Sequence, residues 1–395
     1  MATSVSETLP VLSAEAIAAL ITSLSLPQPT AIEPLRVTAA FHSIYLVHFA
    51  SLPADAAPPF RTPRRPDESV TLVLRVSGRD IPRTKTANEV AVLRWLAGHT
   101  SIPVPAVVRF DATSDNALRR EFTLLERVPG ASVDKMFADM SEDAKVRLVA
   151  QLTDVLVELN AHEWQHVGGL QLDDKTGEAV PGPVLEDTFW MVPDIEAYWS
   201  AEESVTTLNP TGPYKSHAEL VQAFLQVYVH AVSRHESLAW LRQDLQPRLE
   251  ALIAHLPSLE TQLAATRLIL AHKDLHFANV MATPDGTLTG ILDWEFAGVV
   301  PAPRWDPVRA FLWNGQPEEA TGAEKERLRG IFEKTLEERG IEQWWEQGIP
   351  AEVTDVWTVL RFTRALVEVC PRGQRAELVD GWRDAAMAAL TKLGV

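Results

Sequence analysis

The periodicity of the chain changes near residue 128, and this change limits the folds that the chain can adopt. Before it come short runs rich in β-branched and aromatic residues, such as TLVLRVS at 71–77, which are typical of strands. After it, EDAKVRLVAQLTDVLVELNAH at 142–162 carries leucines and valines at three- and four-residue spacing, which predicts a long helix. We therefore predict an α+β protein whose strand-rich N-terminal part is followed by a larger, mostly helical part.

Turn residues mark the boundary between the two parts. Pro129 and Gly130 follow the last strand-like run, EFTLLERV, and both residue types favour turns. We place an N-terminal lobe at 1–127 and a C-terminal lobe at 128–395. In the N-terminal lobe we expect a small antiparallel sheet with one main helix.

Composition excludes several classes of protein. A chain of 395 residues, 46% of them hydrophobic, can bury a large core, and a net charge of −17 argues against a nucleic-acid partner. Cys370 is the only cysteine, which excludes an internal disulfide and a thiolate zinc cluster. No uncharged apolar run reaches the length of about 18 residues that a membrane span needs. We expect a cytoplasmic protein with no membrane partner, and the sequence leaves its oligomeric state open.

The N-terminal stretch also lacks the features of a targeting signal. It has no basic start, and Glu7, Pro10 and Glu15 interrupt its apolar residues. Ser13 is a suitable N-cap and Pro27 a suitable stop, so we predict a short helix between these two residues.

An inward-facing ion pair is predicted in the N-terminal lobe. In the strand at 71–77 the leucines share one face, and Arg75 lies on the other. In the following helix, Glu89 shares the buried face with Leu93 and Leu96. A buried carboxylate needs a cation, and Arg75 is the natural candidate. The alternative is that Arg75 is a solvated strand residue and Glu89 a frayed first-turn acid.

The segment HKDLHFANVM at 272–281 concentrates polar side chains between apolar ones. It leads into two predicted strands around the turn at 284–286, and in an antiparallel hairpin this brings Asn279 close to Asp293. Asp274, five residues before Asn279, is expected to lie close to the same two side chains. Two carboxylates and an amide oxygen form a donor set that suits Mg²⁺ with water and phosphate completing its shell.

Two other interpretations of this segment stay open. His272, Asp274 and His276 could bind a transition metal, but they offer neither a fourth ligand nor a general base. Alternatively, the two histidines are hydrogen-bonding supports of a tight loop. Neither interpretation explains why Asn279 and Asp293 would meet.

The segments AHKDLHFANVM and GILDWEFA together resemble the aminoglycoside phosphotransferase family, which includes choline-kinase-like and other small-molecule kinases. The family's loop usually reads His-Gly-Asp-Leu-His-x-x-Asn, and Lys273 here replaces the glycine, a form that is typical of fungal members. The resemblance covers roughly residues 35–320, with 165–265 poorly matched. It implies a two-lobed protein-kinase-like fold.

The resemblance also implies roles for residues of the C-terminal motifs. Asp274 would be the catalytic base that orients a substrate hydroxyl and accepts its proton. Asn279 and Asp293 would hold Mg²⁺ on the phosphates of a bound nucleotide. The implied reaction moves the γ-phosphoryl group of ATP, or of GTP, to a hydroxyl of a small molecule, amine-bearing acceptors among them.

Further positions would bind the nucleotide itself. Arg75 and Glu89 fall where the family has its phosphate-contacting lysine and the helix glutamate that positions it. The backbone of Glu126 and Val128 would meet the adenine edge. Ser43 would offer a hydroxyl to the phosphates near the first two strands.

Two departures from the family pattern support an alternative function. The expected phosphate-covering loop, near RVTAAFHSIYLVHF, contains no glycine, which limits how closely its backbone can approach phosphates. Arginine at position 75 is bulkier than lysine and always charged. The alternative is therefore a nucleotide-binding pseudokinase with a regulatory or scaffold role.

The acceptor pocket is expected within 165–265, where such kinases build it. Acidic residues there accompany Trp190, Tyr198 and Trp199, and a pocket of acids and aromatic rings suits amines. The competing interpretation is that the aromatic residues belong to the core and the acids to a solvated face.

Overall fold

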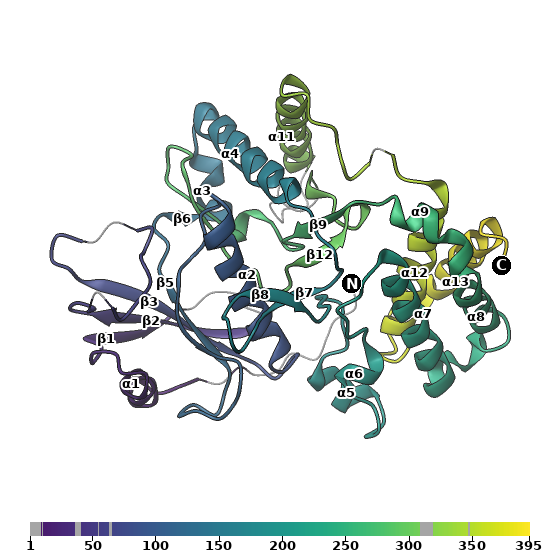
Figure 1. Ribbon diagram of the computed structural model, residues 1–395, viewed down its shortest axis with the longest axis horizontal. Coiled ribbons are helices and arrows are strands. Elements are labelled where there is room, and N and C mark those ends of the chain that lie inside the picture. The colour runs from purple at the N-terminus through teal and green to yellow at the C-terminus, as the bar shows by residue number, and fades with distance from the viewer. Residues whose placement is uncertain are drawn as a thin grey trace.

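In the computed structural model, the described part of the chain comprises residues 9, 11–35, 41–53, 55–62, 65–308, 319–346 and 348–395. Figure 1 shows a sheet-bearing N-terminal part on one side and a larger helical part on the other. The α+β, two-lobed architecture predicted from the sequence is confirmed. Among the described residues, no helix combines the length and apolarity needed to cross a membrane.

The N-terminal part is built on an antiparallel sheet of five strands in the order β1-β2-β3-β5-β4. Leu72, Leu74 and Val76 of β3 are fully buried against α1, as their alternation predicts. Helix α1 begins where Ser13 caps it, by accepting a hydrogen bond from the Ala16 amide. The elements are α1 (Ala14–Ser23), β1 (Ala31–Pro34), β2 (His42–Phe49), β3 (Val70–Ser77), β4 (Val107–Asp111) and β5 (Phe122–Glu126).

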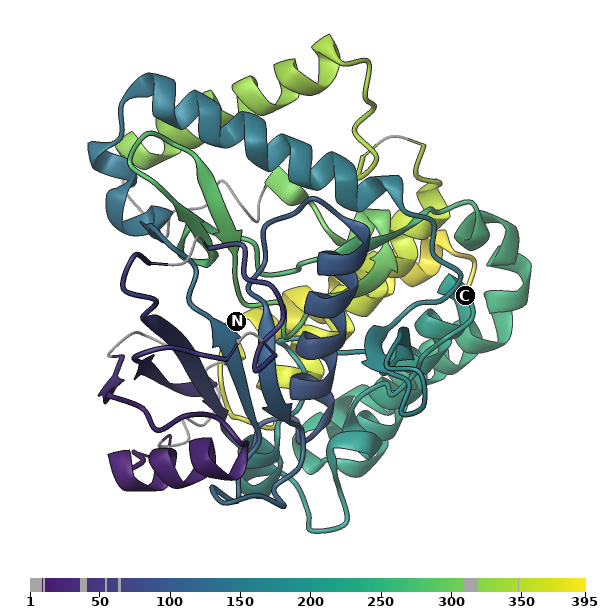
Figure 2. The ribbon, with the colours of Figure 1, turned by 60° about the vertical axis from the view of Figure 1, so that its left-hand side comes forward.

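Helix α2 (Thr84–His99) packs where the two parts meet (Figure 2). Its buried residues join the core of the C-terminal part. The Asn88 side chain fixes the helix there, because its amide group donates to the carbonyl oxygens of Glu295 (3.0 Å) and Ala297 (2.9 Å). Its oxygen accepts from the Leu170 amide at 2.7 Å. The helix is therefore tied to segments more than 80 positions away.

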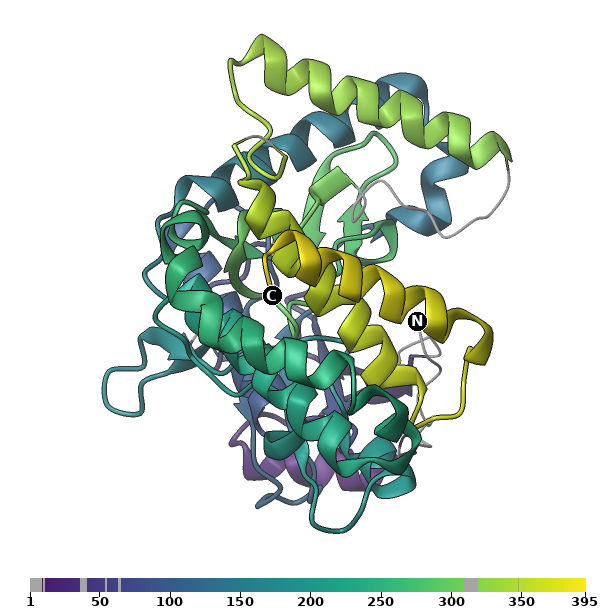
Figure 3. The ribbon, with the colours of Figure 1, turned by 90° about the vertical axis from the view of Figure 1, so that its right-hand side faces the viewer.

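Helices dominate the C-terminal part. Figure 3 shows α12 and α13 side by side across α7 and α8, while α4 and α11 run together at the opposite end. Ser141 caps α4 by accepting a hydrogen bond from the Ala144 amide at 3.3 Å. The helices are α3 (Val133–Met136), α4 (Glu142–Ala161), α5 (Val192–Tyr198), α6 (Val205–Leu208), α7 (His217–Arg234), α8 (Leu245–His255), α9 (Glu260–Ala264), α11 (Glu319–Glu338), α12 (Ala351–Val369) and α13 (Val379–Lys392).

Short strand pairs position the loops of the C-terminal part. The predicted hairpin is present, with Val280 opposite Ile291, and its turn packs so closely on α4 that a Cβ at Gly286 would overlap the Ala144 carbonyl oxygen. The strands are β6 (Ala131–Ser132), β7 (Gly169–Leu172), β8 (Ala179–Gly182), β9 (Leu268–Ala271), β10 (Val280–Ala282), β11 (Leu288–Ile291) and β12 (Gly298–Pro301).

Candidate active site

The predicted ion pair between Arg75 and Glu89 is present where the sheet, α2 and the end of the hairpin meet. Nη1 of Arg75 donates to Oε1 of Glu89, and Nη2 donates to Oδ1 of Asp293 at 2.5 Å. Nη2 also lies 3.3 Å from Nδ1 of His42 at the start of β2. The arginine thus joins residues of three separate segments.

Burial and charge act in opposite directions on this cluster. Burial tends to raise the pKa of Asp293, but the charge of Arg75 and its hydrogen bond outweigh burial, so that the pKa is lowered. Glu89 is more deeply enclosed, and burial raises its pKa in spite of Arg75. Burial also tends to lower the pKa of Arg75, yet the surrounding carboxylates raise it. Asp293 therefore stays a carboxylate at neutral pH, the state that its predicted role as a metal ligand requires.

The loop between β9 and β10 presents Asp274 to solvent. More than half of the Asp274 side chain is exposed, so a substrate hydroxyl could reach its carboxylate. The side-chain amide group of Asn279 donates to the Asp274 carbonyl oxygen at 2.9 Å and lies 3.4 Å from Oδ2. Asp274 and Asn279 are thus brought together, as their spacing predicts.

The histidines of this loop support its backbone. His272 is fully buried, its Nε2 lies 2.8 Å from the Leu292 carbonyl oxygen, and its Nδ1 accepts from the Asp274 amide at 3.3 Å. His276 Nδ1 accepts from the Ala278 amide at 3.2 Å. Burial lowers the pKa of His272, whereas the hydrogen bond to Asp274 raises that of His276. The interpretation as hydrogen-bonding supports is favoured over a transition-metal site.

The hairpin connects the loop to Asp293. The Leu292 amide donates to the Asn279 carbonyl oxygen at 2.8 Å, so that the backbones at 279 and 292 are paired immediately before Asp293. Among the described residues, no three His, Cys, Asp or Glu side chains are grouped to hold a metal by themselves. A carboxylate and a carboxamide oxygen nevertheless fit Mg²⁺, which usually keeps water and phosphate ligands.

A second buried network, which the sequence analysis missed, lies beside Arg75. Lys85 Nζ is 3.3 Å from Glu295 Oε2 and 3.5 Å from Asp80 Oδ2, and His42 Nε2 is 3.5 Å from the same Glu295 oxygen. Lys85 precedes Glu89 by one helical turn, so both point to the same side of α2. The four-residue spacing of Lys85 and Glu89 is the sequence feature that could have predicted a buried Lys85. Glu295 is therefore held between Lys85 and the ring of His42, and burial raises its pKa to about 8.

The other predicted nucleotide-binding residues lie on or near the N-terminal sheet. Ser43 is half-buried in β2 opposite Val76, and residues 36–40 of the expected phosphate-covering loop lie outside the described part. The Glu126 amide donates to the Ala106 carbonyl oxygen at 2.9 Å, so this amide is not a donor for a base. Val128 follows and packs close to Gly290 of β11.

The aromatic residues of the expected acceptor region face a cation of the chain itself. The Arg372 guanidinium lies 3.9 Å from the ring centroid of Trp190 and 6.0 Å from that of Tyr198. Its Nη2 donates to Asp194 at 2.5 Å, and both side chains are buried. Trp199 packs edge-on against Trp190. The core interpretation of these rings is therefore favoured over a cation-binding pocket.

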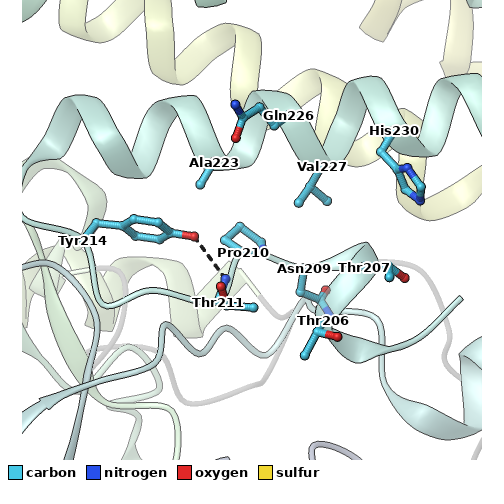
Figure 4. Close-up of a pocket in the computed structure, with 10 residues that line it drawn as sticks. All are labelled: Thr206, Thr207, Asn209, Pro210, Thr211, Tyr214, Ala223, Gln226, Val227 and His230. Carbon is cyan, nitrogen blue, oxygen red and sulfur yellow. Dashed lines mark hydrogen bonds between the residues drawn. The ribbon is translucent and has the colours of Figure 1, made fainter.

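A cavity of about 280 Å³ lies between α7 and the segment that contains α6 (Figure 4). Tyr214 borders it and accepts a hydrogen bond from the Thr211 amide at 3.1 Å. The cavity falls within the expected acceptor region, but none of its lining residues belongs to the predicted catalytic set. It is lined by Thr206, Thr207, Asn209, Pro210, Thr211, Tyr214, Ala223, Gln226, Val227 and His230.

Comparison with known proteins identifies the family to which the chain belongs. Residues 60–341 match the model of the phosphotransferase enzyme family, which is more than half of the chain. The chain therefore belongs to the phosphotransferase enzyme family, and the family prediction made from the two motifs is confirmed.

Curated relatives are distant and fungal. A subtelomeric hrmA-associated cluster protein of Aspergillus fumigatus is 23% identical over 257 residues, covering 55% of this chain and 50% of the relative. The clavilactone A biosynthesis cluster protein Y of Ampulloclitocybe clavipes is 28% identical over 226 residues, covering 55% and 51%. The chain thus spans about half the length of the curated relatives that it matches.

Solved structures align over most of their length at low identity. The GDP complex of aminoglycoside 2'-phosphotransferase-IIIa has a TM-score of 0.46 and 15% identity, with 96% of this chain and 98% of that chain covered. Macrolide 2'-phosphotransferase MphH from Brachybacterium faecium has a TM-score of 0.43 and 16% identity, with 95% and 98% covered.

Proposed function

We propose that this protein transfers the γ-phosphoryl group of ATP, or of GTP, to a hydroxyl of a small molecule. The observation that carries the proposal is the meeting of Arg75, Glu89 and Asp293 across the two lobes. A loop that exposes Asp274 and binds Asn279 precedes the same hairpin. Phosphoryl transfer asks a protein mainly to position reactants and to neutralise phosphate charge, and these residues can do both.

Each side chain has a role that follows from its chemistry. Asp274 accepts the proton of the acceptor hydroxyl and orients the attacking oxygen. Arg75, held by Glu89, presents its guanidinium to the nucleotide phosphates. Asn279 and Asp293 would hold Mg²⁺, which when bound neutralises charge on those phosphates. Ser43 and the backbone at Glu126 and Val128 would complete the nucleotide site, Glu126 through a group other than its amide.

The division at residue 127 also belongs to this proposal. Residues 1–127 would form the nucleotide-binding lobe, and 128–395 would carry the catalytic loop, the metal site and the acceptor pocket. The cavity drawn in Figure 4 lies within the proposed C-terminal lobe.

One observation favours a second candidate, a nucleotide-binding pseudokinase with a regulatory or scaffold role. Arg75 donates a hydrogen bond to Oδ1 of Asp293, and the Asp293 carboxylate is the group that would hold the metal. If this bond persists when a nucleotide is bound, it competes with the metal for that oxygen and weakens metal binding.

The test is ADP formation from Mg-ATP with pooled aminoglycosides, aminoalcohols, sugars and simple amines, in the parent and in Asp274→Ala. We expect acceptor-dependent ADP from the parent and a loss of roughly 100-fold or more in the variant, since general bases contribute that much. The same assay with GTP identifies the preferred nucleotide. Equal ADP formation by both proteins would contradict the role of Asp274, and nucleotide binding without turnover on any acceptor would support the pseudokinase.

A further inference from the structure

Lys273 adopts a backbone conformation that lysine normally avoids. Its φ is +70°, in the left-handed region where the Cβ of an L-residue is crowded. The loop that this sequence resembles has glycine at this position, and glycine adopts such angles freely. A strained residue persists where the surrounding structure compensates for it, so the side chain of Lys273 requires an explanation.

The ammonium group of Lys273 is buried against a distant segment. Nζ donates to the Leu185 carbonyl oxygen, 88 positions earlier in the chain, and lies 3.6 Å from Oε1 of Glu186. The side chains of Lys273 and Glu186 are only 13% and 14% exposed. Arg304 Nη2 also lies 3.8 Å from Glu186 Oε1, so the carboxylate is held from two sides. The catalytic loop and residues 185–186 are thereby joined.

The residues that follow this contact lie near the proposed base. Asp187 is exposed at the surface, yet its surroundings desolvate its carboxylate and raise its pKa, and the charges of Glu186 and Asp274 act in the same direction. Thr188 then borders a small recess together with Arg364 of α12. The phosphate-binding side of the proposed site has different neighbours, Arg75 and Glu89. The segment at 185–188 is therefore joined to the catalytic loop through contacts separate from those of Arg75 and Glu89.

We propose that Lys273 is a positioning residue that fixes residues 185–188 beside Asp274 as the wall of the acceptor site. The ammonium ties this wall to the backbone of the loop that carries the base, so the acceptor and the base keep a constant distance. This inference rests on the proposed phosphotransfer. It predicts that loss of the ammonium affects acceptor use and leaves nucleotide binding intact.

Two substitutions distinguish the effect of the Lys273 ammonium from the effect of its backbone conformation. Lys273→Met keeps the aliphatic stem and removes the charge, whereas Lys273→Gly also relieves the left-handed strain. Lys175→Met, at an exposed lysine in the turn after β7, is the matched control. The Phe189 amide, which donates to the Glu186 carbonyl oxygen at 3.2 Å, reports on the wall through its hydrogen exchange.

We expect the Phe189 amide to exchange about tenfold faster in both Lys273 variants and at the parent rate in the control. ADP affinity, measured by calorimetry, stays within about twofold of the parent, while KM for an acceptor from the pooled panel rises about tenfold with a smaller change in kcat. Unchanged exchange in Lys273→Gly, or ADP affinity lost in parallel with acceptor use, would overturn the inference. If the parent forms no acceptor-dependent ADP, the proposed function fails, and exchange still decides whether Lys273 positions the wall.

Discussion

Arg75 and Asp293 lie 218 positions apart in the chain and are joined by a hydrogen bond of 2.5 Å from Nη2 to Oδ1. The other terminal nitrogen of the same guanidinium donates to Glu89 on α2. Arginine can serve two carboxylates at once because its donors form a rigid fork, whereas a lysine ammonium is a single point of charge. The replacement of the expected lysine by arginine therefore creates a bridge across the proposed site.

If Asp293 holds the metal, Mg²⁺ will tighten ADP binding to the parent but not to Asp293→Asn. We expect the ratio of ADP affinity in Mg²⁺ to that in EDTA to be at least about tenfold smaller in the variant than in the parent, because the substitution removes the charge of a metal ligand. Calorimetric titration with ADP in Mg²⁺ and in EDTA measures this gain. Asp285→Asn is the control, since Asp285 belongs to the same hairpin. Its carboxylate accepts hydrogen bonds from its turn neighbours Thr283 and Thr287 and from Arg147, none of which belongs to the proposed site. An Mg²⁺ effect preserved in Asp293→Asn would exclude the assignment.

Glu89→Gln will destabilise the fold and weaken nucleotide binding. The Glu89 side chain is 2% exposed, so its loss leaves a buried guanidinium with fewer compensating charges. We expect the free energy of unfolding in urea to fall by about 2 kcal/mol, the scale of a hydrogen bond to a charged group. ADP affinity should fall with it, because Arg75 is no longer held toward the phosphates.

Glu196→Gln is the matched control for that substitution. Glu196 pairs with Arg79, but the two side chains are 56% and 47% exposed, and exposed pairs contribute about 0–1 kcal/mol. Equal stability losses in the two variants would show that burial of the Arg75 pair has no special effect.

The parts of the site that sequence reasoning found are those with a local pattern. Glu89 was placed inward by the spacing of Leu93 and Leu96, and the hairpin by the turn residues near Gly286. Pairing of the backbones at 279 and 292 then follows from antiparallel geometry. Such relations depend only on residues within one or two elements.

Contacts between remote segments had no such pattern. The bond from Lys273 to the Leu185 carbonyl oxygen involves a backbone group, which any residue at 185 would provide. The stacking of Arg372 on Trp190 joins the turn after α12 to the segment before α5, and no spacing relates these positions. Lys85 was different, because its position one turn before Glu89 already indicated a buried face.

Acid will destabilise the protein through His217 at the start of α7. The ring is buried, its Nδ1 lies 3.2 Å from the Leu263 carbonyl oxygen, and burial lowers its pKa from 6.5 to about 4. Between these two values the unfolded chain binds a proton that the folded protein does not. The free energy of unfolding therefore decreases as the pH falls from 6.5 to 4, by at most about 1.4 kcal/mol per pH unit from this group.

His217→Asn keeps a donor for the Leu263 carbonyl oxygen and cannot titrate. Urea unfolding at several pH values between 4 and 7 should give a shallower pH dependence for this variant than for the parent. His99→Gln, at an exposed histidine near the end of α2, is the control for replacing a histidine by an amide side chain. Parallel curves for His217→Asn and the parent would assign the acid sensitivity to other groups.

Gly286→Ala will destabilise the hairpin that carries Asp293. Its φ is +83°, and an added Cβ would overlap the carbonyl oxygen of Ala144 in the first turn of α4. Gly177, in the turn between β7 and β8, has a similar φ of +72° with no atom within 4 Å of an added Cβ. We expect Gly177→Ala to cost about 1 kcal/mol through backbone strain alone, and Gly286→Ala about 3 kcal/mol through strain and overpacking together. The difference between the two unfolding free energies measures how tightly the turn is held against α4, and equal values would mean that the turn moves away without cost.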